Sequence, residues 1–483
     1  MHDRVSTDTD NHSHTHALNR YAAVPTAAKL KSDPRFTGSG VRIAFLDSGF
    51  YPHPDISNRI IAFHDIHGEE KTLHSVIEPK AHHWHGTQTV VSCAGSGQLS
   101  DGVYKGIASD AELVLVKVSR SGKISDDSIV TGLEWIKKNR LEYEIRILNI
   151  SLGGDTNAAT KDSRINQLCE ELVEAGVVIT VAAGNSSESC TIPPASSPSV
   201  MTVGGYSDGN VLDGEDLVLY HSSFGTTVDG NVKPELIAPA MFVAAPILPN
   251  TPDYREAEIL SMLSSSPDFS FIALLDEFWE EAGFDNHILN LEIPEARQFV
   301  ETELQKRKII ATHYQHVDGT SFAAPITASV IAQMLEANPL LGPNAIKHIL
   351  ITTAERITSN RAIRQGYGVL NARRAVELAA SERHTGDNKG FKAPVRIGEM
   401  VEFTFHDDHA ASVNLVGDFN EWNRSSVPLK RTSNGIWTTS IQIRLGQRVR
   451  YKLLIDNERW IEDPTHGMKE EDGFGGFHSV LEI

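Results

Sequence analysis

The sequence predicts an α/β protein whose mostly parallel sheet has helices on both faces, followed by a C-terminal all-β sandwich of the immunoglobulin type. Two observations predict this fold class. From residue 41 to about residue 380, short and continuously apolar runs alternate with helical patterns, and strands that are apolar throughout are buried on both faces of a parallel sheet. After residue 394 the pattern changes to an alternation with period two, which is typical of antiparallel strands in a small sandwich.

The individual elements follow from these patterns. Strands of the parallel sheet are expected at 41–46, 112–118, 145–152 and 177–183, and a helix at 126–140 with Ile129, Leu133 and Ile136 on one side. Strands of the sandwich are expected at 401–405, 412–419, 435–443, 449–456 and 478–483. We therefore divide the chain into a disordered tail (1–24), an α/β domain (25–382), a polar linker (383–394) and the sandwich (395–483).

Composition excludes several classes of function. The chain has 483 residues and a net charge of −19, which disfavours nucleic acid and anionic membranes as partners. No apolar run reaches the roughly 18 residues of a membrane span, and the first twenty or so residues lack the apolar stretch of a signal peptide. We expect a cytoplasmic protein.

Cysteine and histidine patterns point to no redox or metal chemistry. The three cysteines are too few and too scattered for a disulfide framework, and we expect inert thiols at Cys93, Cys169 and Cys190. Three alternating histidines near the N-terminus could bind a metal, but their polar surroundings favour a disordered tail: His12, His14 and His16.

Four polar residues stand where elements begin or end. Asp47 (in AFLDSG) and Asn185 (in VAAGNS) end apolar strands, whereas His85 (in WHGTQTVV) and Ser321 (in VDGTSFAAP) open helical runs. The carboxyl ends of parallel strands are where ligands bind in such sheets. Taken singly, each residue is an ordinary turn or cap residue. Together they suffice for acyl transfer, with Ser321 as nucleophile, His85 as base, Asp47 orienting His85, and Asn185 with the Ser321 N–H stabilising an oxyanion. Pro325 is expected in or near the first helical turn, where proline is tolerated.

Five short motifs resemble those of the subtilisin-like serine peptidases. DSG, HGT, SLGG, AAGN and GTSFAAP occur in that family's order, and the resemblance covers roughly residues 25–380. It implies a subtilisin-like fold and a serine endopeptidase that acts on proteins or peptides, with Asp47, His85 and Ser321 as the triad and Asn185 in the oxyanion hole. It further implies that a substrate backbone pairs with the segment Ser151, Leu152, Gly153 and Gly154.

The same resemblance bears on specificity and cofactors. Ile192 falls near the floor of the main specificity pocket, which would favour a modest apolar side chain. Catalysis in this family requires no cofactor; structural calcium is common, although the sequence assigns no ligands for it. Two positions depart from the family pattern, since Trp84 and Ala240 stand where glycine is usual.

An acidic segment at about 245–312 interrupts the resemblance. Residues 240–316 carry 5 Lys/Arg and 13 Asp/Glu, and three Pro-acid pairs, at 252–253, 267–268 and 294–295, are typical of first helical turns. Behind the second pair, one helix face is expected to carry Phe271, Leu275, Phe278 and Ala282, with Gly283 ending the helix. Two interpretations are open: a lid or exosite that would favour basic peptides, or a peripheral decoration.

The C-terminal domain resembles the starch- and glycogen-binding modules. The motifs GDFNEW, PLKR, VRYKLLID and DPT carry this resemblance. It implies α-glucan as a partner, with Trp422 and Trp460 stacking on sugars and Lys452 bonding hydroxyls. The last polar position, usually Asn, falls near His478 or Ser479. The alternative is that one or both tryptophans fill the core or the domain interface.

Two functions from different classes follow. The first is an intracellular serine endopeptidase with an attached sandwich. The second is a glucan-binding or scaffolding protein whose peptidase domain has lost activity. The complete set of Asp47, His85, Ser321 and Asn185 favours the first, because an inactive relic would tolerate the loss of at least one of them.

Overall fold

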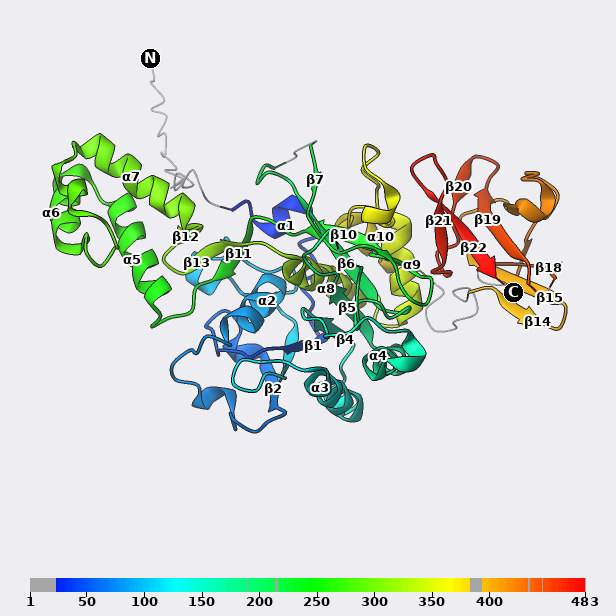
Figure 1. Ribbon diagram of the computed structural model, residues 1–483, viewed down its shortest axis with the longest axis horizontal. Helices are drawn as coiled ribbons and strands as arrows, with labels where there is room; N and C mark the ends of the chain where they lie inside the picture. The colour runs from blue at the N-terminus through cyan, green and yellow to red at the C-terminus, as the bar shows by residue number, and fades with distance from the viewer. Residues whose placement is uncertain are drawn as a thin grey trace, which may run out of the picture.

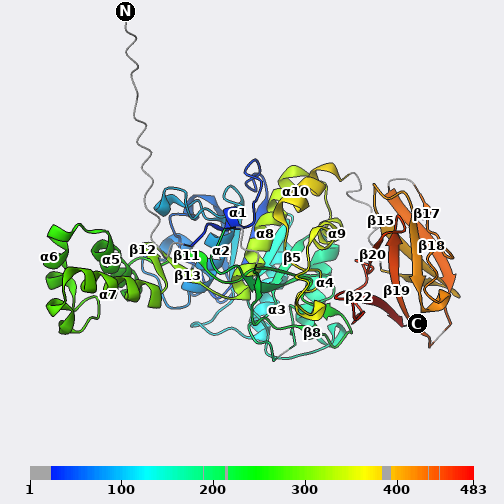
Figure 2. The same cartoon turned by 90° about the horizontal axis from the view of Figure 1, so that it is seen from above.

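The computed structural model describes residues 23–188, 190–212, 216–382, 393–432, 435–444 and 446–482. The histidines of the tail, and most of the predicted tail and linker, lie outside these ranges. Along its longest axis the molecule has three parts, which Figures 1 and 2 show in order: a helical insertion, a central α/β body and a C-terminal sandwich.

The central body is built on an eight-stranded sheet with the order β10-β6-β5-β4-β1-β3-β2, in which β7 pairs with β6. Neighbours along this path are parallel, and only β7 is antiparallel. The strands are β1 (Arg42–Asp47), β2 (Ile60–Asp65), β3 (Glu112–Lys117), β4 (Ile147–Ile150), β5 (Val178–Ala182), β6 (Met201–Ser207), β7 (Val218–Leu219) and β10 (Leu236–Pro239). The predicted fold class is confirmed, and all four strands predicted for this sheet are present.

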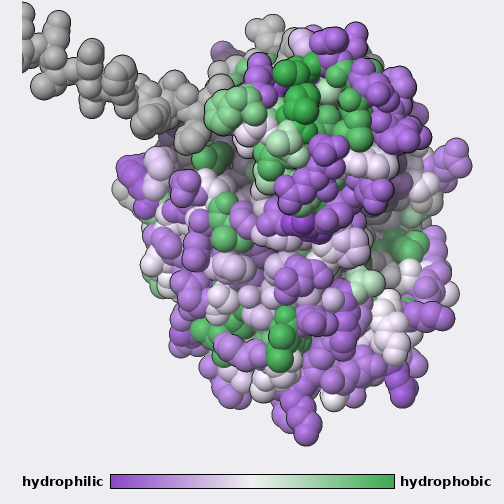
Figure 3. Space-filling view, turned by 90° about the vertical axis from the view of Figure 1, so that its left-hand side faces the viewer, coloured by the Kyte–Doolittle hydropathy of each residue, from purple (hydrophilic) through white to green (hydrophobic). Residues whose placement is uncertain are grey.

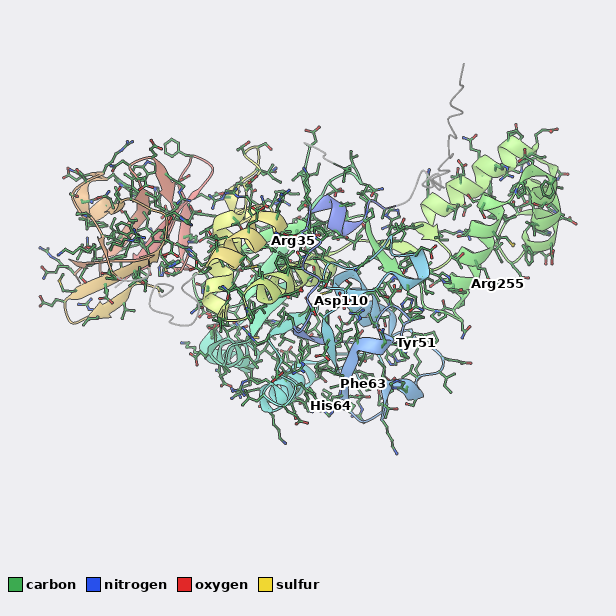
Figure 4. All side chains as sticks on the ribbon, turned by 180° about the vertical axis from the view of Figure 1, so that it is seen from behind. Arg35, Tyr51, Phe63, His64, Asp110 and Arg255 are labelled. Carbon is green, nitrogen blue, oxygen red and sulfur yellow. The ribbon has the colours of Figure 1, made fainter. Side chains whose placement is uncertain are left out.

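Helices cover both faces of this sheet because its strands are apolar on both faces. On β1, Ile43 and Phe45 pack into one core, and Ala44 and Leu46 pack into the other. The first core contains α2 (Trp84–Ala94), α8 (Thr320–Ala337), α9 (Pro343–Thr353) and α10 (Ala372–Ser381), and the second contains α3 (Asp126–Asn139) and α4 (Arg164–Glu174). At the sheet edge, His64 of β2, which is labelled in Figure 4, stacks on Trp135 of α3 with ring centroids 4.7 Å apart.

Shorter elements complete the body. They are α1 (Thr26–Lys29), the hairpin β8 (Gly225–Thr226) and β9 (Val232–Lys233), and the 3₁₀ turns η1 (Ser57–Arg59), η2 (Leu73–Ser75), η3 (Gln98–Ser100), η4 (Thr160–Asp162) and η6 (Ala362–Arg364). Across the part of the chain that the structure describes, no helix combines the length and apolar character needed to span a bilayer.

The inserted segment begins and ends in a small antiparallel sheet, and its helices lie between the strands of that sheet in the sequence. The sheet has the order β11-β13-β12, and Gln88 of α2 donates to the carbonyl of Pro246 on its first strand, at 2.9 Å. The elements are β11 (Val243–Pro246), α5 (Pro252–Ser265), α6 (Asp268–Phe278), η5 (Asn286–Asn290), α7 (Ile293–Lys306), β12 (Ile309–Ala311) and β13 (Tyr314–Val317). The helices therefore begin where the three Pro-acid pairs predict.

The helices of the insertion bury a core of their own. Phe271, Leu275 and Ala282 are buried as predicted, whereas Phe278 is only partly buried. Helix α6 ends at Phe278, and Gly283 follows in the left-handed region with φ +69°. Arg255, labelled in Figure 4, pairs with Glu258 and Glu281 on the surface.

The placement of the insertion bears on the two interpretations of it. In both ribbon views the three helices project beyond the sheet at one end of the molecule (Figures 1 and 2). The space-filling view of that end shows apolar side chains gathered over the insertion among hydrophilic ones (Figure 3). This arrangement favours the peripheral interpretation for α5–α7, while the small sheet at their base lies beside α2.

The C-terminal part packs two antiparallel sheets around one core, as predicted. One sheet has the order β14-β15-β18-β17, and the other has the order β16-β19-β22-β21 with β20 on β19. The elements are β14 (Val395–Ile397), β15 (Met400–His406), β16 (Val413–Gly417), η8 (Asp418–Asn420), β17 (Lys430–Arg431), β18 (Ile436–Gln442), β19 (Arg448–Ile455), β20 (Arg459–Ile461), β21 (Lys469–Glu471) and β22 (Phe477–Glu482).

Candidate active site

Asp47 and His85 form the best-defined pair of the site. Asp47 ends β1, and His85 is the second residue of α2. The Nδ1 of His85 lies 2.8 Å from Oδ1 of Asp47, which also accepts the N–H of Ser48 at 2.6 Å. Because an ionised carboxylate only accepts, Nδ1 carries the proton and Nε2 is left to accept another. Burial lowers the pKa of His85, but the charge of Asp47 and its hydrogen bond outweigh burial and hold this pKa above its ordinary value.

Glycine is required where α2 meets the end of β1. A Cβ on Gly86 would lie 2.2 Å from the carbonyl oxygen of Gly49, so any side chain would push His85 away from Asp47. On the outer side, Trp84 is 48% exposed, and its ring stands edge-on to His85 with centroids 5.4 Å apart. The tryptophan that replaces the usual glycine therefore borders the histidine without entering the core.

Ser321 is the second residue of α8, and its neighbour Phe322 places the helix start beside α2. The ring centroids of Phe322 and His85 are 6.2 Å apart. The hydroxyl of Ser321 donates to the carbonyl of Ser151 at 3.4 Å, and the hydroxyl of Ser151 donates to the carbonyl of Ser321 at 2.8 Å. This reciprocal pair joins the start of α8 to the end of β4.

Pro325 lies inside α8 and not in its first turn, which corrects the expectation from the sequence. Its missing N–H would have bonded the carbonyl of Ser321, four residues earlier. The Ser151 hydroxyl supplies the absent donor, so the helix tolerates proline at this position. Ser151 was predicted as a substrate-binding residue; its side chain acts on the backbone of Ser321.

Asn185 follows β5, and Thr320 fixes its side chain. Its Oδ1 accepts the backbone N–H of Thr320 at 2.9 Å and the Thr320 hydroxyl at 3.0 Å. The hydroxyl of Thr320 in turn accepts the N–H of Gly184 at 3.2 Å. With Oδ1 engaged twice, the amide NH₂ of Asn185 is the free end of the side chain. Thr320 is completely buried, and no separate signal in the sequence predicted its role.

The second departure from the family pattern is compensated by a partner across the sheet. Ala240 follows β10 and is fully buried. A Cβ on Gly205 of β6 would lie 2.2 Å from the methyl group of Ala240, so the alanine fits because the facing residue on the neighbouring strand is glycine. The carbonyl of Ala240 accepts the N–H of Gly319 at 2.8 Å, which ties this strand end to the start of α8.

The segment predicted to pair with substrate extends beyond β4. Ser151 is buried, Leu152 and Gly154 are partly exposed, and Gly153 is exposed. The N–H of Gly154 donates to the carbonyl of Pro193 at 2.8 Å. A Cβ on Gly153 would lie 3.8 Å from Ile192. The predicted substrate strand and the predicted pocket residue Ile192 are therefore neighbours.

The described residues include two groups that could hold a metal ion: Glu70 with His82 and His83, and Glu382 with His406 and Asp408. Both contain imidazole nitrogens, whereas calcium takes oxygen ligands, so neither fits structural calcium. In the first group, Nδ1 of His83 accepts the N–H of Lys80 at 3.0 Å. The proton of the neutral ring then sits on Nε2 and is donated to Glu70 at 2.9 Å, which is the tautomer that a metal on Nε2 would forbid.

The cysteines differ in exposure. Cys93 and Cys169 are buried free thiols, and burial raises the pKa of each. Cys190 is free and exposed.

In the C-terminal sandwich, Lys452 and Trp460 share the outer face of one sheet. Tyr451 and Leu453 point into the core, so Lys452 and Leu454 point outward. Leu454 pairs with Trp460 across the strands, and cross-strand partners lie on the same face. Lys452 forms an ion pair with Asp472 at 2.5 Å. Burial raises the pKa of Asp472, but this hydrogen bond and two backbone N–H groups lower it to about 2.

Trp422 lies beside the predicted last polar position. Its ring is 4.7 Å from that of His478, and its Nε1 donates to Asp418 at 3.2 Å. The guanidinium of Arg424, two residues further on, lies 5.5 Å from the ring centroid of Trp460, so the Trp422 loop and Trp460 are neighbours. Both tryptophans are partly buried, and neither belongs to the sandwich core. Arg424 was not predicted from the sequence.

An Asp-His pair at the carboxyl edge of a parallel sheet, beside a serine at a helix start, is the arrangement of a serine hydrolase. The comparison with known families agrees: residues 38–369 match the subtilase family, and this chain belongs to it. It is a subtilisin-like serine protease. Residues 390–476 match carbohydrate-binding module 48, described as the isoamylase N-terminal domain.

Individual relatives are similar over different lengths. The chain is 31% identical to serine protease AprX of Bacillus subtilis over 72% of this chain and 68% of AprX. It is 35% identical to subtilisin Savinase of Lederbergia lenta over 36% of this chain and 58% of Savinase. The solved structure of a cold adapted subtilisin-like serine proteinase aligns with 70% of this chain and 91% of its own, at 20% identity and a TM-score of 0.42.

Proposed function

We propose that the protein is an endopeptidase that hydrolyses peptide bonds through an acyl-enzyme on Ser321. The observation that carries the proposal is the 2.8 Å contact between His85 Nδ1 and Asp47, at a helix start that lies beside the one carrying Ser321. In the first step, Nε2 of His85 takes the proton of the Ser321 hydroxyl while Oγ attacks the peptide carbonyl. Asp47 stabilises the imidazolium that forms.

The negative charge on the attacked oxygen requires donors. The amide NH₂ of Asn185 is oriented by Thr320, and the N–H of Ser321 lies in the first turn of α8, where it has no helical acceptor. These two groups are the proposed oxyanion hole. His85 then gives its proton to the leaving amine, and water hydrolyses the acyl-enzyme by the same steps. None of these steps uses a cofactor.

Proteins or peptides are the proposed substrates, with the backbone at Ser151–Gly154 as their pairing edge. The exposed Gly153 and partly exposed Gly154 leave room for an extended chain. The test is hydrolysis of a denatured protein and of short peptides by the wild-type chain and by Ser321→Ala. Cleavage by the wild type alone supports the proposal, and equal cleavage by both removes Ser321 from the mechanism.

The alternative, a binding or scaffolding protein with an inactive peptidase domain, receives no support from the site. Asp47, His85 and Asn185 each keep the contacts their roles require. A fully engaged Asp-His pair beside an oriented amide is what an active hydrolase needs.

As a second function, we propose that the C-terminal module binds α-glucan weakly. The supporting observation is the outer face on which Lys452 and Trp460 stand, with Trp422 and Arg424 at its border. Burying one indole face, at about 25 cal/mol per Å², is worth roughly 1–2 kcal/mol. Two rings then support dissociation constants of about millimolar to tens of micromolar, which suits a polymer with many sites.

Retardation of the full chain in a native gel cast with glycogen tests this second function. Trp422→Ala is expected to restore normal mobility. Trp84→Ala is the matched control, because this tryptophan is exposed but lies at the peptidase site. Identical migration of the wild type with and without glycogen would leave the module with a structural role only.

A further inference from the structure

The two domains enclose a cavity of about 580 Å³ between helices α9 and α10 and one end of the sandwich. This volume lies within the roughly 300–1,000 Å³ of small-molecule sites, which occur preferentially at domain interfaces. Trp460 and Arg459 line it from the sandwich, and Thr352, Arg374 and Glu382 line it from the peptidase domain. Figure 2 shows these helices beside the sandwich.

Direct contacts between the domains hold the cavity open. Arg356 forms an ion pair with the buried Glu462, and the N–H of Val232 donates to the carbonyl of Gly467 at 2.9 Å. Further out, Arg361 pairs with Glu471 at 2.7 Å. Because partners from both domains are engaged on several sides, the cavity is preformed and does not need a ligand to assemble it.

The sheet face that carries Lys452 and Trp460, which is proposed above to bind glucan, leads into this cavity. Along β19, Lys452 and then Leu454 lie on the sheet face opposite the sandwich core, where Leu454 is fully buried and pairs with Trp460. The hairpin that follows carries Asp456 and Arg459, and both line the cavity together with Trp460. A linear chain lying on Lys452 and Trp460 is therefore directed toward the peptidase domain.

The lining suits hydroxyl-rich ligands better than charged or apolar ones. It combines aromatic rings, of which Trp460 and Tyr367 are two, with donors such as Arg374 and Arg459 and acceptors such as Glu382 and Asp456. Sugar hydroxyls donate and accept, so they can use both kinds of group. Carboxylates from both domains, Glu382 and Asp456 among them, disfavour a polyanion, and the many charged groups of the lining disfavour a purely apolar ligand.

We propose that this interdomain cavity is an oligosaccharide site, in which the end of an α-glucan chain bound by the module contacts α9 and α10 of the peptidase domain. The proposal rests on the glucan function proposed above. It extends that function from a surface of the module to a site that both domains build, with Arg374 as a donor to sugar hydroxyls and Thr352 on the opposing wall.

Calorimetric titration of the full chain with maltoheptaose and maltotriose tests the proposal. Since the longer probe reaches both Trp460 and the cavity, it is expected to bind several-fold more tightly. Arg374→Ala removes charge-assisted hydrogen bonds and is expected to weaken maltoheptaose binding by about 10-fold. Thr352→Trp fills the cavity and is expected to reduce maltoheptaose affinity to that of maltotriose.

Arg373→Ala is the matched control. Arg373 and Arg374 are adjacent exposed residues of α10, and each pairs with one glutamate, but only Arg374 lines this cavity. The control is expected to bind like the wild type.

The remaining outcomes separate the two proposals. If Trp422→Ala loses maltoheptaose binding while Arg374→Ala and Thr352→Trp bind like the wild type, the cavity proposal is wrong. The proposal that the module binds glucan on its surface is then supported. If the wild type binds neither probe and is not retarded by glycogen, the glucan function fails and the cavity proposal fails with it.

Discussion

The carbonyl oxygen of Ser321 accepts its hydrogen bond from the hydroxyl of Ser151, at 2.8 Å, in place of the helical N–H that Pro325 lacks. A side chain at the end of β4 thus completes the first turns of the helix that carries the proposed nucleophile. This relationship predicts that the two positions are energetically coupled.

Ser151→Ala is expected to lower the free energy of unfolding by about 1–3 kcal/mol, because it leaves the partly buried Ser321 carbonyl without its donor and the buried Asn149 amide without an acceptor. In a Pro325→Ala background the restored N–H can bond the Ser321 carbonyl, so the same change is expected to cost clearly less. Urea unfolding of the wild type, the two single variants and the double variant gives the interaction energy between positions 151 and 325. Strictly additive effects would contradict the account of Pro325.

Thr320→Val keeps the shape of a buried side chain but removes the hydroxyl that binds Asn185 and Gly184. We expect kcat to fall about 2- to 10-fold with little change in KM, since one hydrogen bond of about 0.5–1.5 kcal/mol no longer orients the oxyanion donor. Thr327→Val, on the same helix, is the control, because its hydroxyl bonds only the Ala323 carbonyl.

Asn185→Ala itself is expected to lower kcat about 10²- to 10³-fold, the magnitude known for the equivalent asparagine of subtilisin, a member of this family. In that background Thr320→Val should have almost no further effect on kcat. A full and independent loss from Thr320→Val in both backgrounds would show that Thr320 does not act through Asn185.

The raised pKa of His85 sets the acidic limb of the pH profile of kcat/KM, which is the pH range over which activity is lost on acidification. Neutral His85 is the active form, so kcat/KM is present above this pKa and is lost as pH falls through it. In Asp47→Asn the charge that raises the pKa is gone while burial, which lowers it, remains. The limb is therefore expected to move to lower pH, together with a loss of about 10⁴-fold in kcat.

The pH dependence of kcat/KM for a sensitive peptide substrate measures this shift. Asp127→Asn, which removes an exposed acid from the first turn of α3, controls for the general effect of losing one charge. A limb that stays in place or moves upward in Asp47→Asn would mean that Asp47 does not govern the proton affinity of His85.

Replacing residues 251–307 by a short Gly-Ser bridge removes the helices of the insertion but keeps β11, β12 and β13. Because α5–α7 project beyond the sheet (Figure 1), we expect cleavage of large proteins and of small peptides to change by the same factor. The ratio of kcat/KM for casein to that for a short peptide measures this. A selective gain on casein would indicate a lid, and a selective loss would indicate an exosite.

Much of the fold could be predicted because its signals are local. The buried face of α3 and the Pro-acid helix starts of the insertion depend on spacing within one turn, and they agree with the structure. Asp47 and Asn185 could be placed at a common sheet edge because parallel strands share one, and the register of β1 with β4 and of β4 with β5 does align them.

The features that could not be predicted depend on contacts between distant segments. Ser151 and Ser321 are separated by 170 positions, and nothing in either motif reveals their hydrogen bond. The methyl group of Ala240 fits only because Gly205 faces it from the neighbouring strand. Arg424 over Trp460 likewise depends on how a loop folds back onto a sheet.

The predicted position of Pro325 was wrong because it, too, depends on a contact between distant segments. Proline is expected in or near a first turn, where no helical acceptor is lost. In the structure the helix starts at Thr320 and the acceptor is lost, but a hydroxyl from another element replaces the donor. Local rules fail where a tertiary contact supplies what the local sequence lacks.

The central claim is that Ser321 is a nucleophile activated by His85, and covalent labelling tests it most directly. The full chain is incubated with a fluorophosphonate, digested, and the adduct is located by mass spectrometry. The account predicts one adduct, on Ser321, that is absent in His85→Ala, together with a loss on the order of 10⁶ in kcat for Ser321→Ala, as known for this substitution in subtilisin of the same family. An adduct on another residue, or none on a protein that still cleaves peptides, would contradict it.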